Sequence, residues 1–173
     1  MDLLETIYKR RSIRNFVPGG VILSNVVKNI IDAGIRAPSG KNGQPWNFAV
    51  IDNKKVIDKI SEYSRYKNTI SNSSCLILVY LDKNRSYDLK KDTLAIGACV
   101  ENMLLTACNY DIACCWNGDI LSNADSVNDI LEISDSYELM AMICLGIEDT
   151  KITKYLKKTN RKNVDSTILN WIG

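Results

Sequence analysis

Three arginines lie within five residues near the start of the chain: Arg10, Arg11 and Arg14, with the hydroxyl of Ser12 between them. Guanidinium groups bind phosphate through forked pairs of N–H donors, so this spacing is suited to a phosphate or a similar anion. The same basic residues would also complement the negative end of a preceding helix dipole. On spacing alone the two interpretations are equally good, although the mutual repulsion of three arginines favours an anionic partner.

A second candidate is the segment from Ala37 to Trp46, which packs two prolines, two glycines and short polar side chains between a predicted helix and a predicted strand. Regular structure cannot use all of its backbone amides. Free amides and amide side chains suit the polar rim of a flat heterocycle, with Trp46 as an anchor in the core. A rigid connector with a structural tryptophan is the alternative interpretation.

The composition excludes several classes of chemistry. The chain contains no histidine, which excludes Ser-His-Asp and Cys-His hydrolases and metal sites with histidine ligands. None of the six cysteines has C-x-x-C spacing, so we expect buried free thiols and no metal. A net charge of +2 without aromatic interleaving indicates no nucleic-acid partner. The apolar stretches are shorter than the roughly 18 residues of a membrane span, and no secretory leader is recognisable, so we expect a cytoplasmic protein.

The hydrophobic pattern indicates one domain over residues 1–173, built from helices and strands. The run Cys75–Leu81 is apolar without alternation, which predicts a central strand covered on both faces and therefore helices on two sides of a sheet. Other predicted elements are helices over 2–11, from Ser24 to about Ala37, and over 53–63, and strands over 47–52, 112–116 and 139–147. Ser122 is a candidate cap for a helix that contains Val127, Ile130 and Leu131.

The longest predicted helix spans about 88–110 and is apolar nearly all round. Such a helix must be buried on every side, and a chain of this size rarely hides six turns alone. We therefore expect a homodimer with this helix at the interface. A monomer whose sheet and loops cover the helix is the alternative. After Asp149 the chain becomes basic and loses periodicity, so 150–173 is expected to be a tail.

These motifs, in this order, resemble those of the FMN-dependent nitroreductase family along nearly the whole chain. The arginine cluster with Phe16 is similar to the family's opening R-R-S-x-R-x-F, and residues 37–46 are similar to its A-P-S-x-x-N-x-Q-P-W. The long helix carries Asp92 and Asn102 as in D-x-x-x-A-x-x-x-x-x-N-x-x-x-A. The later family motifs resemble Cys115-Trp116-x-Gly118 and Leu145-Gly146.

The resemblance implies an α+β fold in three layers, α-β-α, with a central, mostly antiparallel or mixed sheet and a dimer that shares its active sites. It implies FMN at the interface, its phosphate held by Arg10, Ser12 and Arg14 with Arg11 nearby. A loop of the other chain would approach the ring, through the residues Pro38, Ser39, Gly40, Asn42 and Gln44. Backbone near Asn117 and Gly118 would address the reactive edge of the ring. A late basic residue would join the phosphate clamp, best Arg161, otherwise Lys158 or Lys162, and the tail would wrap the partner subunit.

The implied activity is a ping-pong transfer of electrons from NAD(P)H or another donor, through FMN, to an electrophilic acceptor such as a nitroaromatic or a quinone. The flavin carries the chemistry, so no catalytic side chain is expected. Dehalogenation, enone reduction, flavin cleavage and a non-catalytic FMN-binding dimer are the alternatives. Asp111 and Ala113 replace family glycines; because Asp tolerates a left-handed backbone, we expect a change of loop detail only.

Overall fold

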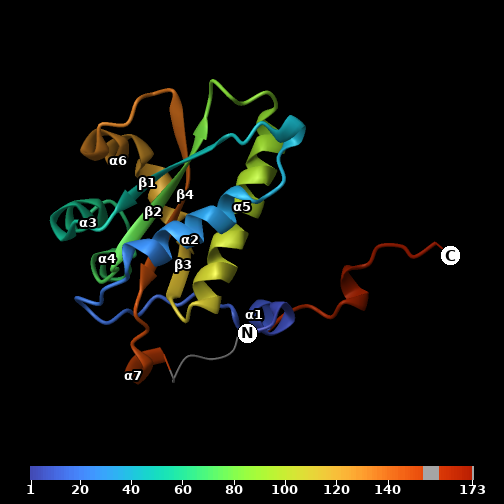
Figure 1. Ribbon diagram of the computed structural model, residues 1–173, viewed down its shortest axis with the longest axis horizontal. Helices are drawn as coiled ribbons and strands as arrows, with labels where there is room; N and C mark the ends of the chain where they lie inside the picture. The colour runs from blue at the N-terminus through green and yellow to red at the C-terminus, as the bar shows by residue number, and fades with distance from the viewer. Residues whose placement is uncertain (154–159, 173) are drawn as a thin grey trace.

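The computed structural model of the chain describes residues 1–153 and 160–172 (Figure 1). Its centre is a four-stranded sheet in the order β1-β2-β4-β3, and each pair of neighbouring strands is antiparallel. The expected antiparallel arrangement is thus confirmed. The strands are β1 (Trp46–Ile51), β2 (Cys75–Asp82), β3 (Ala113–Asn117) and β4 (Tyr137–Gly146).

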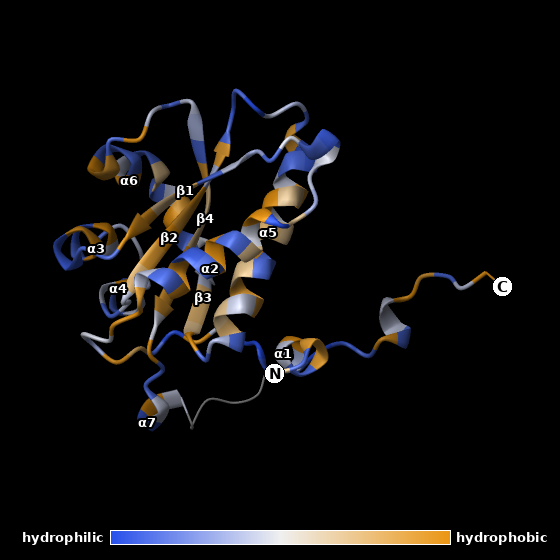
Figure 2. Cartoon of the chain, in the orientation of Figure 1, coloured by the Kyte–Doolittle hydropathy of each residue, from blue (hydrophilic) through white to orange (hydrophobic). Residues whose placement is uncertain are grey.

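Strand β2 is buried along its whole length, as its unbroken apolar run predicts. Because successive side chains of a strand point to opposite faces, β2 supplies two separate cores. Ile77 and Val79 pack in one core with helices α2 (Ser24–Ile35) and α5 (Leu89–Asn109). The intervening residues of β2 pack in the other core, with helices α3 (Lys54–Ser61) and α6 (Ala124–Leu131). Figures 1 and 2 show these helices on either side of the largely hydrophobic strands, which confirms the three-layer α-β-α prediction.

All but one of the short elements named below were not predicted by the hydrophobic pattern. A helix of four or five residues completes at most about one and a half turns, too few to establish a 3.6-residue period. The short helices and 3-10 turns are α1 (Leu3–Lys9), η1 (Gly40–Asn42), α4 (Lys67–Ser71), η2 (Asp119–Asn123), α7 (Thr150–Thr153) and η3 (Asp165–Thr167). Of these, only the first helix was expected.

The predicted capping role of Ser122 is wrong. Ser122 lies inside η2, and α6 begins at Ala124 behind Asn123, whose side chain makes no capping hydrogen bond. The reason is tertiary: Ile120 is fully buried in the second core, and the chain reaches it through the tighter 3-10 turn before α6 begins.

The prediction that α5 is buried on every side does not hold for a single chain. Leu94 is 68% exposed and Glu101 is also exposed on the outer face of the helix. Other exposed apolar side chains gather on α1 and near the C-terminus: Leu3, Leu4, Ile7, Tyr8, Leu169, Trp171 and Ile172. Residues 160–172 extend away from the sheet beyond α1 (Figures 1 and 2). Exposed apolar surface of this kind marks a site of association. No helix in the described residues is long and apolar enough to cross a membrane.

Candidate active site

The arginine-rich segment follows α1 and is fixed by its backbone and by one aromatic ring. The N–H of Ile13 donates to the carbonyl of Cys114 at 2.9 Å, which fastens the segment to the start of β3. Phe16 forms a β-bridge with Glu148. Its buried ring packs so closely on Gly146 that a Cβ added there would lie 2.6 Å from the ring. The sequence thus places a rigid attachment point immediately after the arginines.

The three guanidinium groups differ in their partners. The Nε of Arg10 lies 3.3 Å from a carboxylate oxygen of Glu101, and Arg11 donates to Glu148 at 3.0 Å. Arg14 has no ion pair within residues 1–153 and 160–172, and its guanidinium lies 6.0 Å from the ring centroid of Tyr66. Each of these ion pairs has one partner that is substantially exposed, and surface ion pairs contribute only about 0–1 kcal/mol, so an incoming phosphate can compete for Arg10 and Arg11.

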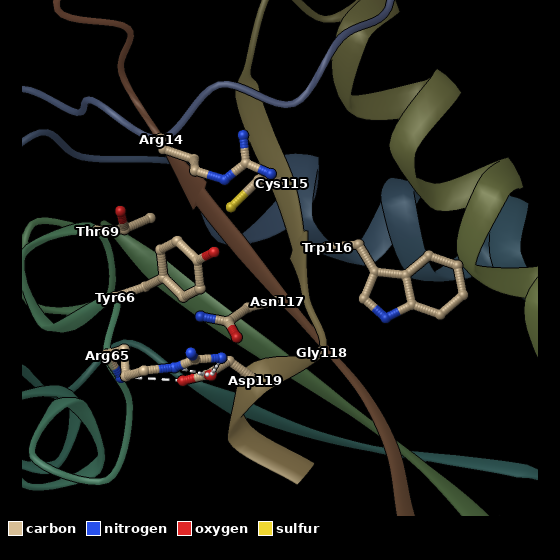
Figure 3. A pocket seen from close by; sticks show the side chains of 9 residues that line it. All are labelled: Arg14, Arg65, Tyr66, Thr69, Cys115, Trp116, Asn117, Gly118 and Asp119. Carbon is tan, nitrogen blue, oxygen red and sulfur yellow. Dashed lines mark hydrogen bonds and ion pairs between the residues drawn. The ribbon is translucent and has the colours of Figure 1, made fainter. Parts of the chain in front are cut away.

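Arg14 faces a cavity of about 220 Å³ at the end of β3. Two segments supply the other walls: the C-terminal end of β3 and the connection between α3 and α4. The lining residues are Arg14, Arg65, Tyr66, Thr69, Cys115, Trp116, Asn117, Gly118 and Asp119 (Figure 3). Figure 3 shows Arg14, Tyr66 and Cys115 pointing toward one another, whereas the indole of Trp116 points to the other side of β3. The fold therefore brings together Arg14, Asn117 and Gly118, three of the residues that the sequence proposed.

The far wall of the cavity is held by an ion pair between Arg65 and Asp119. The Nε of Arg65 donates to one carboxylate oxygen of Asp119 at 2.7 Å. The backbone N–H of Arg65 and the hydroxyl of Ser64 donate to the other oxygen, each at 2.9 Å. These hydrogen bonds hold the pKa of Asp119 below its ordinary value, so the carboxylate stays ionised. No motif or spacing predicted Arg65, Tyr66 or Thr69, because they lie in and before the short, unpredicted helix α4.

The glycine-rich segment forms a tight, strained loop around η1. Lys41, Asn42 and Gln44 all have positive φ, at 54°, 54° and 47°. The N–H of Gln44 donates to the hydroxyl of Ser39 at 3.0 Å. A Cβ on Gly40 would stand 1.9 Å from the hydroxyl of Tyr87, so a larger side chain there must displace the Tyr87 ring. The backbone conformation is uncommon for residues other than glycine, and such conformations persist where surrounding contacts fix them.

This loop does not reach the cavity within one chain. It packs beside Tyr87 at the N-terminal end of α5, whereas Arg10 contacts Glu101 nearer the C-terminal end and Met1 contacts Asn109 at that end. At 1.5 Å per residue, Tyr87 and Glu101 are separated by about 20 Å of helix. The cavity that holds Arg14, Asn117 and Gly118 is lined by none of the predicted loop residues, which are Pro38, Ser39, Gly40, Asn42 and Gln44.

The remaining predicted residues have simpler outcomes. Ser12, Arg161 and Lys162 are exposed, and none of the three lines the cavity. Lys158 lies outside the described residues. Asp111 has a φ of 55°, which confirms that it takes the left-handed position expected of it, and it accepts a hydrogen bond from Lys9 at 2.7 Å.

Comparisons with known proteins identify the family of the chain. The nitroreductase family model matches residues 7–74 and 65–147. The "Putative NADH dehydrogenase/NAD(P)H nitroreductase" of Archaeoglobus fulgidus is 29% identical over 148 residues, which is 84% of each chain. A "Putative NAD(P)H nitroreductase" of Bacillus subtilis is 35% identical over 86 residues, 49% of this chain and 41% of that relative.

Among solved structures, a "putative nitroreductase in complex with fmn" from Desulfovibrio desulfuricans superposes with a TM-score of 0.90 at 30% identity. That match covers 100% of this chain and 98% of the other. The resemblance deduced from the R-R-S and A-P-S motifs is thus confirmed in both sequence and fold. The chain belongs to the nitroreductase family.

Proposed function

We propose that this FMN-dependent oxidoreductase passes electrons from NAD(P)H, or another donor, to a small electrophilic acceptor such as a nitroaromatic or a quinone. The observation that carries the proposal is the cavity that joins Arg14, whose guanidinium forms no ion pair with the residues that the structure describes, to Asn117 and Gly118. The names of the relatives support NAD(P)H as the donor and FMN as the cofactor.

The residues of the cavity fit FMN in both charge and shape. The phosphate is an anion, and Arg14 offers forked donors without an ion pair among the described residues. The ring is flat, and a Cβ on Gly118 would meet nothing within 4 Å, so a flat group can approach the backbone there. Arg10 would add a second cation near the phosphate by exchanging its partner Glu101 for the anion.

When bound, FMN supplies the two-electron chemistry, and the residues of the chain bind and orient. Arg14 neutralises the anionic cofactor, and the Asn117–Gly118 backbone forms the floor of the cavity. Tyr66 offers an aromatic face on which a planar donor or acceptor can stack. Holding the two reactants in contact lowers the entropic part of the barrier without a proton-transfer residue, which suits a chain with no histidine.

We further propose that each complete site needs two chains. The loop around η1 lies at the N-terminal end of α5, Arg10 contacts Glu101 nearer its C-terminal end, and the outer face of α5 exposes Leu94. A two-fold axis beside α5 would bring the N-terminal end of one helix next to the C-terminal end of the other. The loop of the partner chain would then close the cavity, and the exposed apolar residues of α1 and of 160–172 would be covered.

Mixed dimers test the shared site directly. One variant carries Arg10→Ala with Arg14→Ala, and the other carries Gly40→Val, which drives a side chain into Tyr87 and distorts the loop. Each homodimer should be inactive. After the variants are unfolded together and refolded as an equal mixture, half of the dimers are mixed, and each mixed dimer has one intact site. Activity should therefore return to about one quarter of the wild-type value.

A site contained within one chain gives the opposite result, because every chain in the mixture then carries a defect. Failure of the mixture to regain activity, with mixed dimers demonstrated by differential tagging, would refute the shared site. Wild type taken through the same refolding is the control for yield.

Purified protein should hold or take up FMN and show a ping-pong cycle. In anaerobic stopped-flow, NAD(P)H should bleach the flavin absorbance without an acceptor present, and a nitroaromatic or a quinone should restore it in a separate step. Steady-state double-reciprocal plots should be parallel. A panel that includes halogenated phenols and enones separates the other flavin reactions of the family. Colourless protein that takes up no added FMN would refute the proposal.

A further inference from the structure

Two cysteines of neighbouring strands form a pair beside the cavity. Cys115 of β3 is directly opposite Cys144 of β4, and both side chains lie in the same core. Both are free thiols. Directly opposed residues in an antiparallel pair have Cα atoms about 4.5–5.5 Å apart, within the range of roughly 4.4–6.8 Å that a disulfide spans. The backbone therefore already holds the two sulfurs at a separation that a disulfide can bridge with a small adjustment.

Only one of the two thiols faces the cavity. Cys115 lines it, and Figure 3 shows its sulfur between Arg14 and Tyr66. Cys115 is 2% exposed, whereas Cys144, beside it on the neighbouring strand, has no exposed surface. Thr69 also lines the cavity and adds a side chain that carries a hydroxyl group. A small molecule entering the cavity can thus meet Cys115 directly and Cys144 only through it.

The surroundings of the pair also give the two thiols different pKa values. A hydrogen bond with the Cys144 thiol lowers the pKa of Cys115, and the positive charge of Arg14 lowers it further, against the effect of burial. The same hydrogen bond and complete burial raise the pKa of Cys144 well above its ordinary value. Burial raises the pKa of Cys75, Cys99 and Cys114 to about 12. Because the thiolate is the nucleophile, Cys115 should react ahead of these thiols.

We propose that Cys115 and Cys144 are a redox-active pair that a small hydroperoxide oxidises to a disulfide. The Cys115 thiolate attacks one peroxide oxygen: a sulfur–oxygen bond forms, the oxygen–oxygen bond breaks, and the leaving alkoxide takes a proton to become an alcohol, or water. Cys115 is then a sulfenic acid. The sulfur of Cys144 attacks it, the sulfur–sulfur bond forms, and water leaves with the Cys144 proton. In total two thiols and one hydroperoxide give one disulfide, one alcohol and one water.

Arg14 links this reaction to the cofactor. The guanidinium that stabilises the Cys115 thiolate is the one that we assign to FMN, and Cys115 lines the same cavity as Asn117 and Gly118. Bound FMN would therefore cover Cys115 and protect it. Only this protection rests on the proposed function; the reaction of the thiol pair itself does not.

The experiment treats the full-length protein with hydrogen peroxide, with and without saturating FMN, then alkylates the remaining thiols. Intact mass and peptide mapping follow. Without FMN, wild type should lose two hydrogens and two alkylation sites, yield a peptide joined through Cys115 and Cys144, and recover both thiols with dithiothreitol. Cys144→Ser should stop at a sulfenic acid on Cys115, trapped by dimedone. Cys115→Ala should leave Cys144 unmodified.

Cys114→Ser is the matched control, because Cys114 is the neighbouring residue in β3 but lies in the opposite core. It should form the disulfide as wild type does. Arg14→Gln should slow the oxidation of Cys115, because the positive charge of Arg14 favours the thiolate. Circular dichroism establishes that each variant is folded.

The outcomes separate the two claims. If folded, FMN-free protein forms no Cys115–Cys144 disulfide, or if oxidation falls equally on the other cysteines, the thiol pair is refuted, whatever the result of FMN titration. If the disulfide forms but saturating FMN gives no protection, the pair stands, and the placement of FMN in this cavity is refuted.

Discussion

Replacing both Arg10 and Arg14 by Ala should weaken FMN binding by several kcal/mol. A hydrogen bond to a charged group contributes roughly 1.5–3 kcal/mol, so loss of two such contacts gives about 3–6 kcal/mol, more than a hundredfold in Kd. Arg14→Ala alone should account for the larger part. Its guanidinium is free of ion pairs within the described residues, whereas Arg10 must leave Glu101 to reach an anion.

Quenching of flavin fluorescence during titration measures this loss. Lys28→Ala is the matched control: Lys28 is an exposed cation within α2 and is not one of the residues assigned to the cofactor. It should bind FMN as wild type does. An unchanged Kd in the double variant would show that the cluster serves the helix end and not the cofactor.

Phe16→Ala should lower the free energy of unfolding by about 3–5 kcal/mol, the usual cost of removing a buried phenyl ring. Phe16 is 3% exposed, and its ring fills the space that Gly146 leaves at the end of β4. The adjacent Val17 N–H donates to the carbonyl of Ile147 at 2.8 Å, so the ring and the backbone fasten the same segment. Because Arg14 is two residues away, FMN affinity should fall with stability.

Urea denaturation followed by circular dichroism gives the change in free energy. Val17→Ala, in the same segment but with a side chain 41% exposed, is the comparison and should change stability by no more than about 0.5 kcal/mol. A loss below about 1 kcal/mol in Phe16→Ala would mean that the arginine segment is held by its backbone alone.

The long, strongly patterned elements were predictable from the sequence, and the short ones were not. The apolar run of β2 and the long apolar pattern of α5 are strong signals, so the ends of both elements were predicted to within one or two residues. Helix α4 is five residues long and has no period to detect. The start of α6 depends on where Ile120 enters the core, which is a tertiary contact and invisible in the local sequence.

The candidate site divides in the same way. Motifs identified Arg14, Asn117 and Gly118, which the fold brings to one cavity from segments a hundred residues apart. They could not identify Arg65 or Tyr66, because these enter the cavity through a turn whose path depends on the packing of α3 and α4. The pairing of Cys115 with Cys144 depends on strand register, which no spacing along the chain reveals.

The length of α5 has a consequence for how the protein responds to its own concentration. If the loop around η1, at the N-terminal end of this helix, completes the Arg14 cavity only across two chains, then cofactor capture and chain association share one equilibrium. Linkage requires the effect to be mutual: FMN tightens the dimer by the same factor by which dimerisation tightens FMN. Dilution should therefore release flavin, and an excess of flavin should keep the dimer assembled at concentrations where the FMN-free protein separates into single chains.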